Sequence, residues 1–439
     1  MHCGLDFGTS NSTLGTLGAD GTPHLAPLEG NNATIPSAIF FDFENDATLF
    51  GRRAQAAYVG GTDGRLMRSL KSILGTQLVE EKTRIKKHML PYVDILGLFI
   101  AELKRQAEAA RGETLDRVVV GRPVHFVDDD ETADLKAQKQ LEGAVKAQGF
   151  RHIEFQYEPI AAALDYEQQV TREELGLVID LGGGTSDFSI VRVSPDGARS
   201  ADRQRDILAA AGVHIGGTDF DRLLSMAKVM PALGYRTETA DGKRPLPSGP
   251  YYDLASWHRI NRLYTAHTLT ELRQTRREAA FPKRVEKLIS IVSHREGHRL
   301  ASSVEAAKIA LTAQQAATLD FHGETVTFAL PVERAELAAA LNEAIGRIAM
   351  TIEATLKLAG VTAGQIQTLI LTGGSTQIPA IMARLNAIFP GARFVETDAF
   401  GSVGLGLALD AARKFGWVEI VGKAARLPSP LRAGLSHMG

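Results

Sequence analysis

The chain is poor in the features that cross-link a protein or anchor it in a membrane. It has one cysteine, Cys3, among 439 residues, which excludes an intramolecular disulfide and a cysteine-based zinc cage. No apolar run approaches the ~18 residues that a membrane-spanning helix needs. No charged-then-apolar leader precedes the first predicted strand. These absences predict a cytoplasmic protein without a membrane partner.

An excess of charge of one sign is also missing. The formal net charge is -2, so the chain has no overall field that would attract nucleic acid or anionic lipid. The stretch 271–299 mixes eight Lys or Arg with four Glu and is typical of a solvated helical face. A partner-docking surface is the alternative for this stretch. We therefore expect no nucleic-acid partner.

What the chain does contain is a repeated motif. Asp6 and Asp180 each end an apolar stretch and are followed by glycine, by hydroxyl residues and by a second β-forming segment. This pattern predicts two β-hairpins with glycine-opened turns. Glycine lets the backbone approach a ligand closely, and the N–H groups of such a turn can converge on an anion. An Asp beside the turn can hold a hydrated metal ion. Two such hairpins indicate two related lobes that hold a polyphosphate between them.

A third glycine turn, 373–376, follows the predicted strand 368–372. A lone glycine triplet is usually only a flexible turn, but three glycine turns at strand ends are hard to explain by packing alone. The sequence has neither a Walker A lysine pattern nor a Rossmann glycine fingerprint in the right context. The common nucleotide-binding folds are therefore not indicated.

Strands and helices alternate along the chain, which predicts an α/β fold. The length exceeds that of a typical single core, so two lobes are expected. We place lobe I at 1–170 and lobe II at 171–399, with an insertion at about 231–300. A small-residue-rich helix at 400–416 is expected to pack back near lobe I, and 417–439 is expected to form a loose tail.

These motifs resemble, in order, those of the actin-like ATPase superfamily and, within it, the seventy-kilodalton heat-shock chaperones of the DnaK type. The matching segments are the first phosphate loop at 6–12, the first connecting helix at 158–164, the second phosphate loop at 180–187, the glycine-glycine-acid turn at 216–221 and the adenosine motif at 371–379. The resemblance covers residues 4 to about 415. It implies two duplicated, ribonuclease-H-like lobes around a nucleotide cleft that takes ATP or ADP with Mg²⁺.

The resemblance also implies which residues hold the nucleotide phosphates and the metal. Asp6, Asp180 and Asp187 match carboxylates that organise Mg²⁺ through its waters, an arrangement that suits an ion that keeps much of its hydration shell. The phosphate-binding positions implied by the resemblance are Gly8, Thr9, Ser10, Asn11, Gly182, Gly183, Gly184, Thr185, Gly216 and Gly217.

Four residues match catalytic positions of the family: Lys71, Glu158, Asp180 and Thr185. Lys71 matches the lysine that positions the attacking water and offsets the charge of the γ-phosphate. Its alternative is a solvated side chain on a short helix predicted over 66–74. Thr185 is expected near the γ-phosphate, and Glu158 is expected to couple the metal site to the helix that links the lobes.

The ribose and base are expected between two further groups of residues. Gly373, Gly374 and Ser375 form one side, and Glu305, Lys308 and Thr312, on one face of a predicted helix, form the other. Two planar cations of the family are missing here, because Ile309 and Gln377 stand where it has arginine. Both losses remove groups that can stack on adenine.

The resemblance implies slow, Mg-dependent ATP hydrolysis by a monomer that acts on an unknown protein partner or client. Nothing after about Phe415 resembles the family's linker or peptide-binding β-sandwich, so the chain resembles an ATPase half standing alone. Gln138 stands where the family has an arginine that reports the nucleotide state. The alternatives are a small-molecule kinase of the same superfamily, a filament former and a non-catalytic nucleotide sensor.

Overall fold

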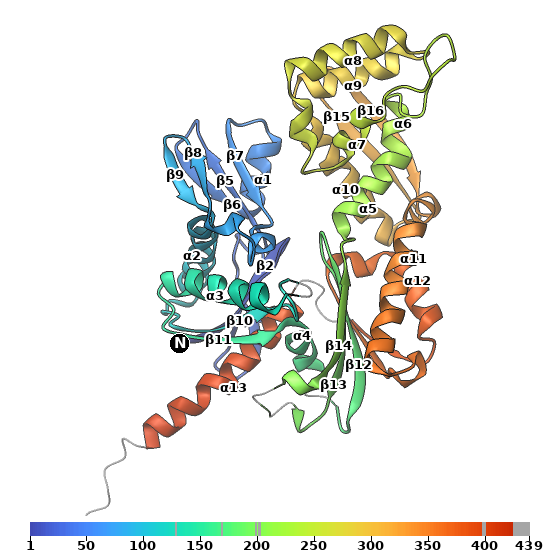
Figure 1. The fold of residues 1–439 in the computed structure, drawn as a ribbon. Helices are drawn as coiled ribbons and strands as arrows, with labels where there is room; N and C mark the ends of the chain where they lie inside the picture. Colours follow the sequence, from blue (N-terminus) through green and yellow to red (C-terminus); the bar gives the residue numbers. More distant parts are fainter. Residues whose placement is uncertain (128–129, 168–169, 198–199, 201–202, 397–400, 425–439) are drawn as a thin grey trace, which may run out of the picture.

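The computed structural model describes residues 1–127, 130–167, 170–197, 200, 203–396 and 401–424, and its ribbon forms two lobes (Figure 1). We call β1 to α4 together with α13 the N-terminal lobe, and β12 to β18 the C-terminal lobe. The expected boundary at 399 and the part of the expected tail beyond 424 lie outside the described residues.

The N-terminal lobe contains the following elements: β1 (His2–Phe7), β2 (Asn11–Leu17), β3 (Pro23–Leu25), β4 (Ile35–Pro36), β5 (Ala38–Asp42), β6 (Ala47–Phe50), α1 (Gly51–Val59), β7 (Gly64–Arg68), β8 (Lys82–Ile85), β9 (His88–Pro91), α2 (Tyr92–Arg111), β10 (Arg117–Arg122), α3 (Glu131–Ala147), β11 (His152–Tyr157), α4 (Glu158–Glu167) and α13 (Ser402–Ala424).

The C-terminal lobe contains a second set: β12 (Glu174–Leu181), β13 (Ser186–Val193), β14 (Ile207–Val213), α5 (Gly217–Leu224), α6 (Met230–Ala232), α7 (Gly249–Ala255), α8 (Ala266–Glu278), α9 (Pro282–Ser293), α10 (Gly297–Ala313), β15 (Ala316–His322), β16 (Thr327–Glu333), α11 (Arg334–Ala359), β17 (Thr368–Thr372), α12 (Pro379–Ile388) and β18 (Arg393–Glu396).

The central sheets of the two lobes have the same topology. The N-terminal sheet runs β11-β10-β1-β2-β3 and the C-terminal sheet runs β18-β17-β12-β13-β14. In each sheet a parallel triplet adjoins an antiparallel hairpin, β1–β2 in one lobe and β12–β13 in the other. The predicted hairpins and the predicted duplicated α/β fold are therefore confirmed.

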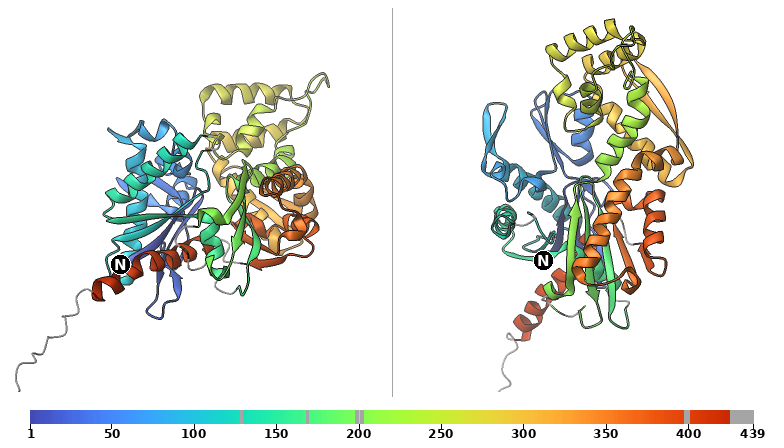
Figure 2. Two further views of the ribbon diagram at one scale, coloured as in Figure 1. Left: turned by 60° about the horizontal axis from the view of Figure 1, so that its bottom comes forward. Right: turned by 45° about the vertical axis from the view of Figure 1, so that its right-hand side comes forward.

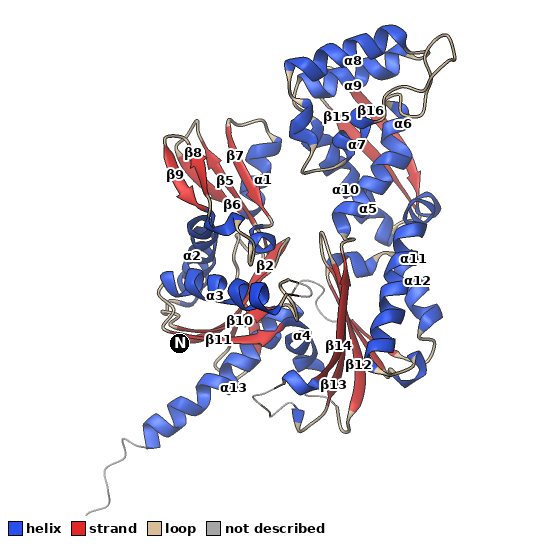
Figure 3. Cartoon of the chain, in the orientation of Figure 1, coloured by secondary structure: helices blue, strands red, loops and turns tan. Residues whose placement is uncertain are grey.

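Helices cover the outer faces of these sheets. Figure 3 shows α2 and α3 beside the N-terminal sheet, and α11 and α12 beside the C-terminal sheet. Helix α2 turns its apolar positions inward, including Leu96, Phe99 and Leu103, and it ends at Gly112, whose backbone is left-handed. The amphipathic spacing read from the sequence thus places this helix on the core of its lobe.

The short helix predicted over 66–74 is wrong for its first part. Residues up to Arg68 form the strand β7, which pairs with β5, and only Leu70–Ile73 form a single 3₁₀ turn. Pairing with a strand about thirty residues earlier outweighs the local helical spacing of the leucines, because strand formation depends on the neighbouring strand. Consequently Arg68 lies on a strand, and Lys71 lies on the turn that follows it.

Helices α4 and α13 cross closely between the two sheets. A third core, distinct from those of the lobes, gathers Ala161, Val178, Ile370 and Leu407 at this crossing. A Cβ atom on Gly406 would lie 1.8 Å from the Ala161 carbonyl oxygen, so only glycine permits this approach. Helix α13 contacts β1 and β2, and its last turns project away from both lobes (Figure 2). The helix runs on to Ala424, past the expected end at 416.

Among the described residues, we find no helix whose length and apolar character would let it cross a membrane.

Candidate functional site

The turns of the two equivalent hairpins touch each other. A Cβ atom on Gly183 would lie 2.0 Å from Ser10 Oγ, so the absence of a side chain at Gly183 is what allows the turns to meet. A Cβ atom on Gly8 would lie 2.1 Å from the Asn11 carbonyl oxygen, and Thr9 is half-buried in the same turn. The structure thus brings the two predicted phosphate turns together.

Two further glycine turns join the second hairpin turn. The backbone N–H of Gly217 donates to Gly182 O at 2.9 Å, and a Cβ on Gly216 would lie 2.5 Å from Gly184 N. Gly373 has a φ of 82°, and a Cβ atom on it would lie 2.3 Å from the Leu181 carbonyl oxygen. Four glycine turns from distant parts of the sequence therefore meet where β1 and β12 end.

Acidic side chains gather beside these turns. Asp6 and Asp180 lie near the ends of β1 and β12, at equivalent places in the two sheets. Lys71 forms an ion pair with Glu158, which begins α4. The Lys71 side chain is 8% exposed, so it is not a solvated surface group.

Burial and mutual repulsion perturb this acidic cluster. Burial, reinforced by Glu158, raises the pKa of Asp6 to about 7. Burial, then Asp187, Glu158 and Asp6, raises the pKa of Asp180 to about 8. Burial alone would lower the pKa of Lys71, but Glu158, Asp6 and Asp180 together raise it. When these carboxyl groups are ionised, the cluster carries more negative charge than Lys71 neutralises, and a divalent cation held through waters fits this surplus.

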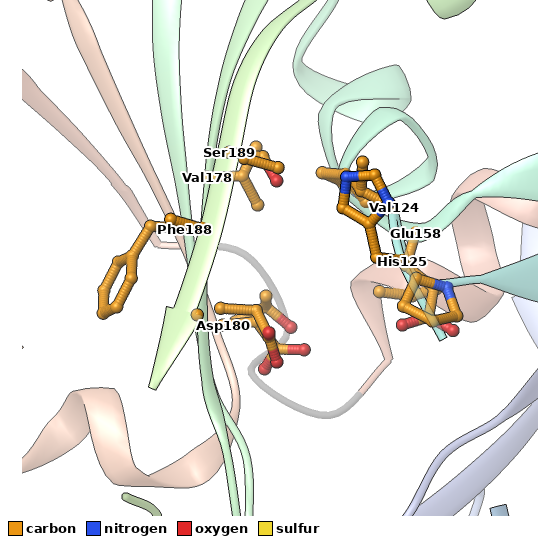
Figure 4. Close-up of a pocket in the computed structure, with 15 residues that line it drawn as sticks. Val124, His125, Glu158, Val178, Asp180, Phe188 and Ser189 are labelled. Atoms are coloured by element: carbon orange, nitrogen blue, oxygen red, sulfur yellow. The ribbon is translucent and has the colours of Figure 1, made fainter. Parts of the chain in front are cut away.

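A cavity opens beside the cluster and is lined by residues of both lobes. Figure 4 shows Val124, His125 and Glu158 on one side, facing Val178, Asp180 and Ser189 on the other. Asp187 also lines the cavity and accepts a hydrogen bond from Thr185 Oγ1 at 3.0 Å. Among the described residues, no three His, Cys, Asp or Glu side chains meet closely enough to ligate a metal directly.

The residues predicted for ribose and base are brought together only in part. Lys308 Nζ lies 2.8 Å from Asp221 Oδ1 and donates to Gly217 O at 3.2 Å. A Cβ on Gly217 would lie 3.0 Å from Ser375 Oγ, in the short turn Gly374–Gln377 that Gly373 opens. Glu305 is exposed one turn earlier on α10, and the Thr312 hydroxyl is used within the helix, donating to Ile309 O at 2.7 Å.

Sequence reasoning missed three residues at or near the site. Asp221 stands in the matched glycine-glycine-acid turn, but its partner Lys308 is far away in the sequence. Lys71 and Glu158 are likewise 87 residues apart. His125 lines the cavity, and Arg68 lies close to Glu305 and Asp221. No spacing pattern marks His125 or Arg68. The roles assigned above to the individual site residues stay predictions.

The duplicated sheets, the paired hairpin turns and the cleft between the lobes define an actin-like ATPase fold. Within that class, the family model described as Hsp70 protein matches residues 93–230 and 283–419. The chain belongs to the Hsp70 family.

Individual relatives agree with the family match. The chaperone protein HscA of Edwardsiella ictaluri is 26% identical over 467 aligned residues, which cover 100% of this chain and 62% of the relative. The chaperone protein DnaK of Thermotoga neapolitana is 31% identical over 50% of this chain and 34% of its own length. The chain thus spans less than two thirds of the length of these curated relatives.

Proposed function

We propose that the chain binds ATP with Mg²⁺ between its lobes and hydrolyses it slowly. The observation that carries this proposal is the equivalent placement of Asp6 and Asp180, one per lobe, beside two glycine turns in contact. A polyphosphate lying between the turns would meet backbone N–H groups from both lobes. Bound Mg²⁺ would neutralise phosphate charge and the surplus of the acidic cluster.

Three side chains have proposed roles in hydrolysis and in lobe closure. Lys71, held by Glu158, would place a fixed positive charge beside the terminal phosphate and offset its negative charge. Thr185 presents a hydroxyl that is oriented by Asp187. Glu158 also begins α4, so a change at the phosphates can reach the crossing of α4 with α13 between the lobes. Lobe closure would then alter a surface offered to a partner.

We base the proposed biological role on the two relatives described above. Both are described as chaperone proteins, and we infer a chaperone-related or partner-regulating role for this chain. Its cytoplasmic location and monomeric state belong to the same proposal. A co-purification with and without ATP would test it, because partners that depend on lobe closure should differ between the two conditions.

A nucleotide sensor that does not turn over is the second candidate. It is favoured by Ile309 and Gln377, which are both exposed and cannot supply a planar cation to the base. Single-turnover release of phosphate from radiolabelled ATP separates the two. We expect slow, Mg-dependent release; saturating ATP binding with no release above the spontaneous rate would favour the sensor.

A further inference from the structure

Arg68 lies at a place in the fold where an arginine is costly. It ends β7 in the N-terminal lobe, is half-buried, and its guanidinium carbon lies 4.7 Å from the ring centroid of Trp257 in the C-terminal lobe. Within the part of the chain that the structure describes, its side chain makes no hydrogen bond and no ion pair. The five N–H donors of its half-buried guanidinium are therefore available to a ligand.

The charges that act on Arg68 belong to the predicted base site. Glu305 and Asp221 stabilise its charge against burial, and Asp221 is paired with Lys308. Lys308 in turn contacts Gly217, beside Ser375. Arg68 thus faces the same group of residues as the expected ribose and base, but from the opposite lobe.

The Trp257 ring under Arg68 is held in place by its neighbours. His298 packs against Trp257 edge-on, with ring centroids 4.8 Å apart, and also against Tyr58 of the N-terminal lobe at 4.7 Å. Burial lowers the pKa of His298 to about 4, so at neutral pH its ring is uncharged and does not repel the guanidinium. Figure 1 shows β7 and α1 at the edge of the N-terminal lobe that faces α7. Helix α7 ends two residues before Trp257 in the sequence.

We propose that Arg68, supported by Trp257, is the residue that binds the nucleotide base, so that a planar cation from the N-terminal lobe replaces those missing at positions 309 and 377. The guanidinium offers a flat face for stacking, and its free N–H groups offer donors to ring nitrogens. This inference rests on the proposed ATP site. It also gives a role to the predicted insertion at 231–300, which supplies Trp257.

The test compares ATP, ADP and inorganic tripolyphosphate by calorimetry on the whole chain with Mg²⁺ present. For Arg68→Ala we expect ATP and ADP to bind at least tenfold more weakly, while tripolyphosphate, which has no base, binds within twofold of wild type. Arg68→Lys should fail to restore binding fully, because an ammonium lacks the stacking plane. Arg65→Ala is the matched control, since Arg65 is on the same strand but donates to Arg84 O at 2.9 Å.

A second readout follows the tryptophan. Trp417→Phe leaves Trp257 as the only tryptophan of the chain, and in that background ATP should change its fluorescence while tripolyphosphate should not. Wild-type affinity of Arg68→Ala for ATP, tighter ATP binding, or equal losses for ATP and tripolyphosphate would each overturn the assignment. Wild type that binds neither ATP nor tripolyphosphate would overturn the proposed function as well, so the two failures are distinguishable.

Discussion

At the scale of single residues, the site is a balance of charges rather than a set of independent groups. Lys71 is buried against Glu158, and its own charge is maintained by Asp6 and Asp180. The charge of Arg122 is likewise balanced by its neighbours. Its guanidinium donates to Gln138 and forms an ion pair with Asp134 at 2.7 Å. The position where the family has an arginine therefore holds an amide that accepts from an arginine on the neighbouring strand β10.

Lys71→Ala should slow single-turnover hydrolysis by a factor of about 10² to 10³, the usual cost of removing one preorganised charge or donor. ADP binding should change much less, because ADP lacks the terminal phosphate. Substituting the exposed Lys87 by Ala is the control. Equal hydrolysis rates in Lys71→Ala and wild type would remove Lys71 from the catalytic site.

Thr185→Ala should lower the hydrolysis rate in the same way, whereas Thr185→Ser should retain most of it because serine keeps the hydroxyl that donates to Asp187. The measurement is the hydrolysis rate of wild type, Thr185→Ala and Thr185→Ser at saturating ATP. If serine and alanine are equally slow, the hydroxyl is not the active group, and the β-branched shape of threonine matters instead.

The raised pKa values of Asp6 and Asp180 make a prediction about pH. In the unfolded chain both carboxyls have ordinary pKa values near 4, so between about pH 4 and 8 the folded protein binds more protons than the unfolded one. The metal-free protein should therefore lose stability as pH rises through this range. Asp180→Asn should flatten the profile and raise the melting temperature at pH 8.

Calorimetric melting in EDTA from pH 5 to 9 provides the measurement. Ser189→Ala, on the same side of the cavity but without a charge to lose, is the control. Parallel profiles for wild type and Asp180→Asn would show that the Asp180 carboxyl is ionised without cost in the folded state.

At the scale of elements, the crossing of α4 and α13 depends on one missing side chain. Gly406→Ala should destabilise the protein by about 1–3 kcal/mol, the usual cost of overpacking, because its Cβ would meet the Ala161 carbonyl. Gly143→Ala, in the exposed part of α3 with open space around it, should instead stabilise by about 0.5–1 kcal/mol. Urea denaturation of both variants tests the contrast; two changes of the same sign would contradict it.

The sequence predicted the elements that repeat and missed those that depend on distant partners. The hairpins at Asp6 and Asp180 could be read locally, since an apolar strand, a glycine and hydroxyl residues are contiguous. Lys71 could be proposed only through the family resemblance, because its partner Glu158 is 87 residues away. Arg68 was not proposed, because residues 66–74 alone predict a helix. The pairing of β7 with β5, which makes Arg68 part of a strand, depends on residues elsewhere in the chain.

At the scale of the whole molecule, Tyr58 is one of the residues through which the two lobes contact each other. Across the lobes, Tyr58 Oη of α1 accepts from Asn261 Nδ2 at 2.8 Å and lies 3.0 Å from Asn261 Oδ1, to which it can donate. Tyr58→Phe removes the hydroxyl and should speed ADP release about fivefold, as expected for a loss of about 1 kcal/mol. Stopped-flow displacement of a fluorescent ADP measures the rate, with Tyr92→Phe as control. Unchanged release would mean that the contact does not hold the cleft closed.

The central claim is that both lobes grip one nucleotide through Asp6, Asp180 and the glycine turns beside them. Its most direct measurement is calorimetric titration of the whole chain with ATP, with and without Mg²⁺, in wild type and in Asp6→Asn and Asp180→Asn. We predict one ATP per chain, tighter binding with Mg²⁺, and loss of most of the Mg²⁺ effect in each variant, although the two residues belong to different lobes. An absence of ATP binding at millimolar ligand, or a Mg²⁺ effect that survives both substitutions, would contradict the account.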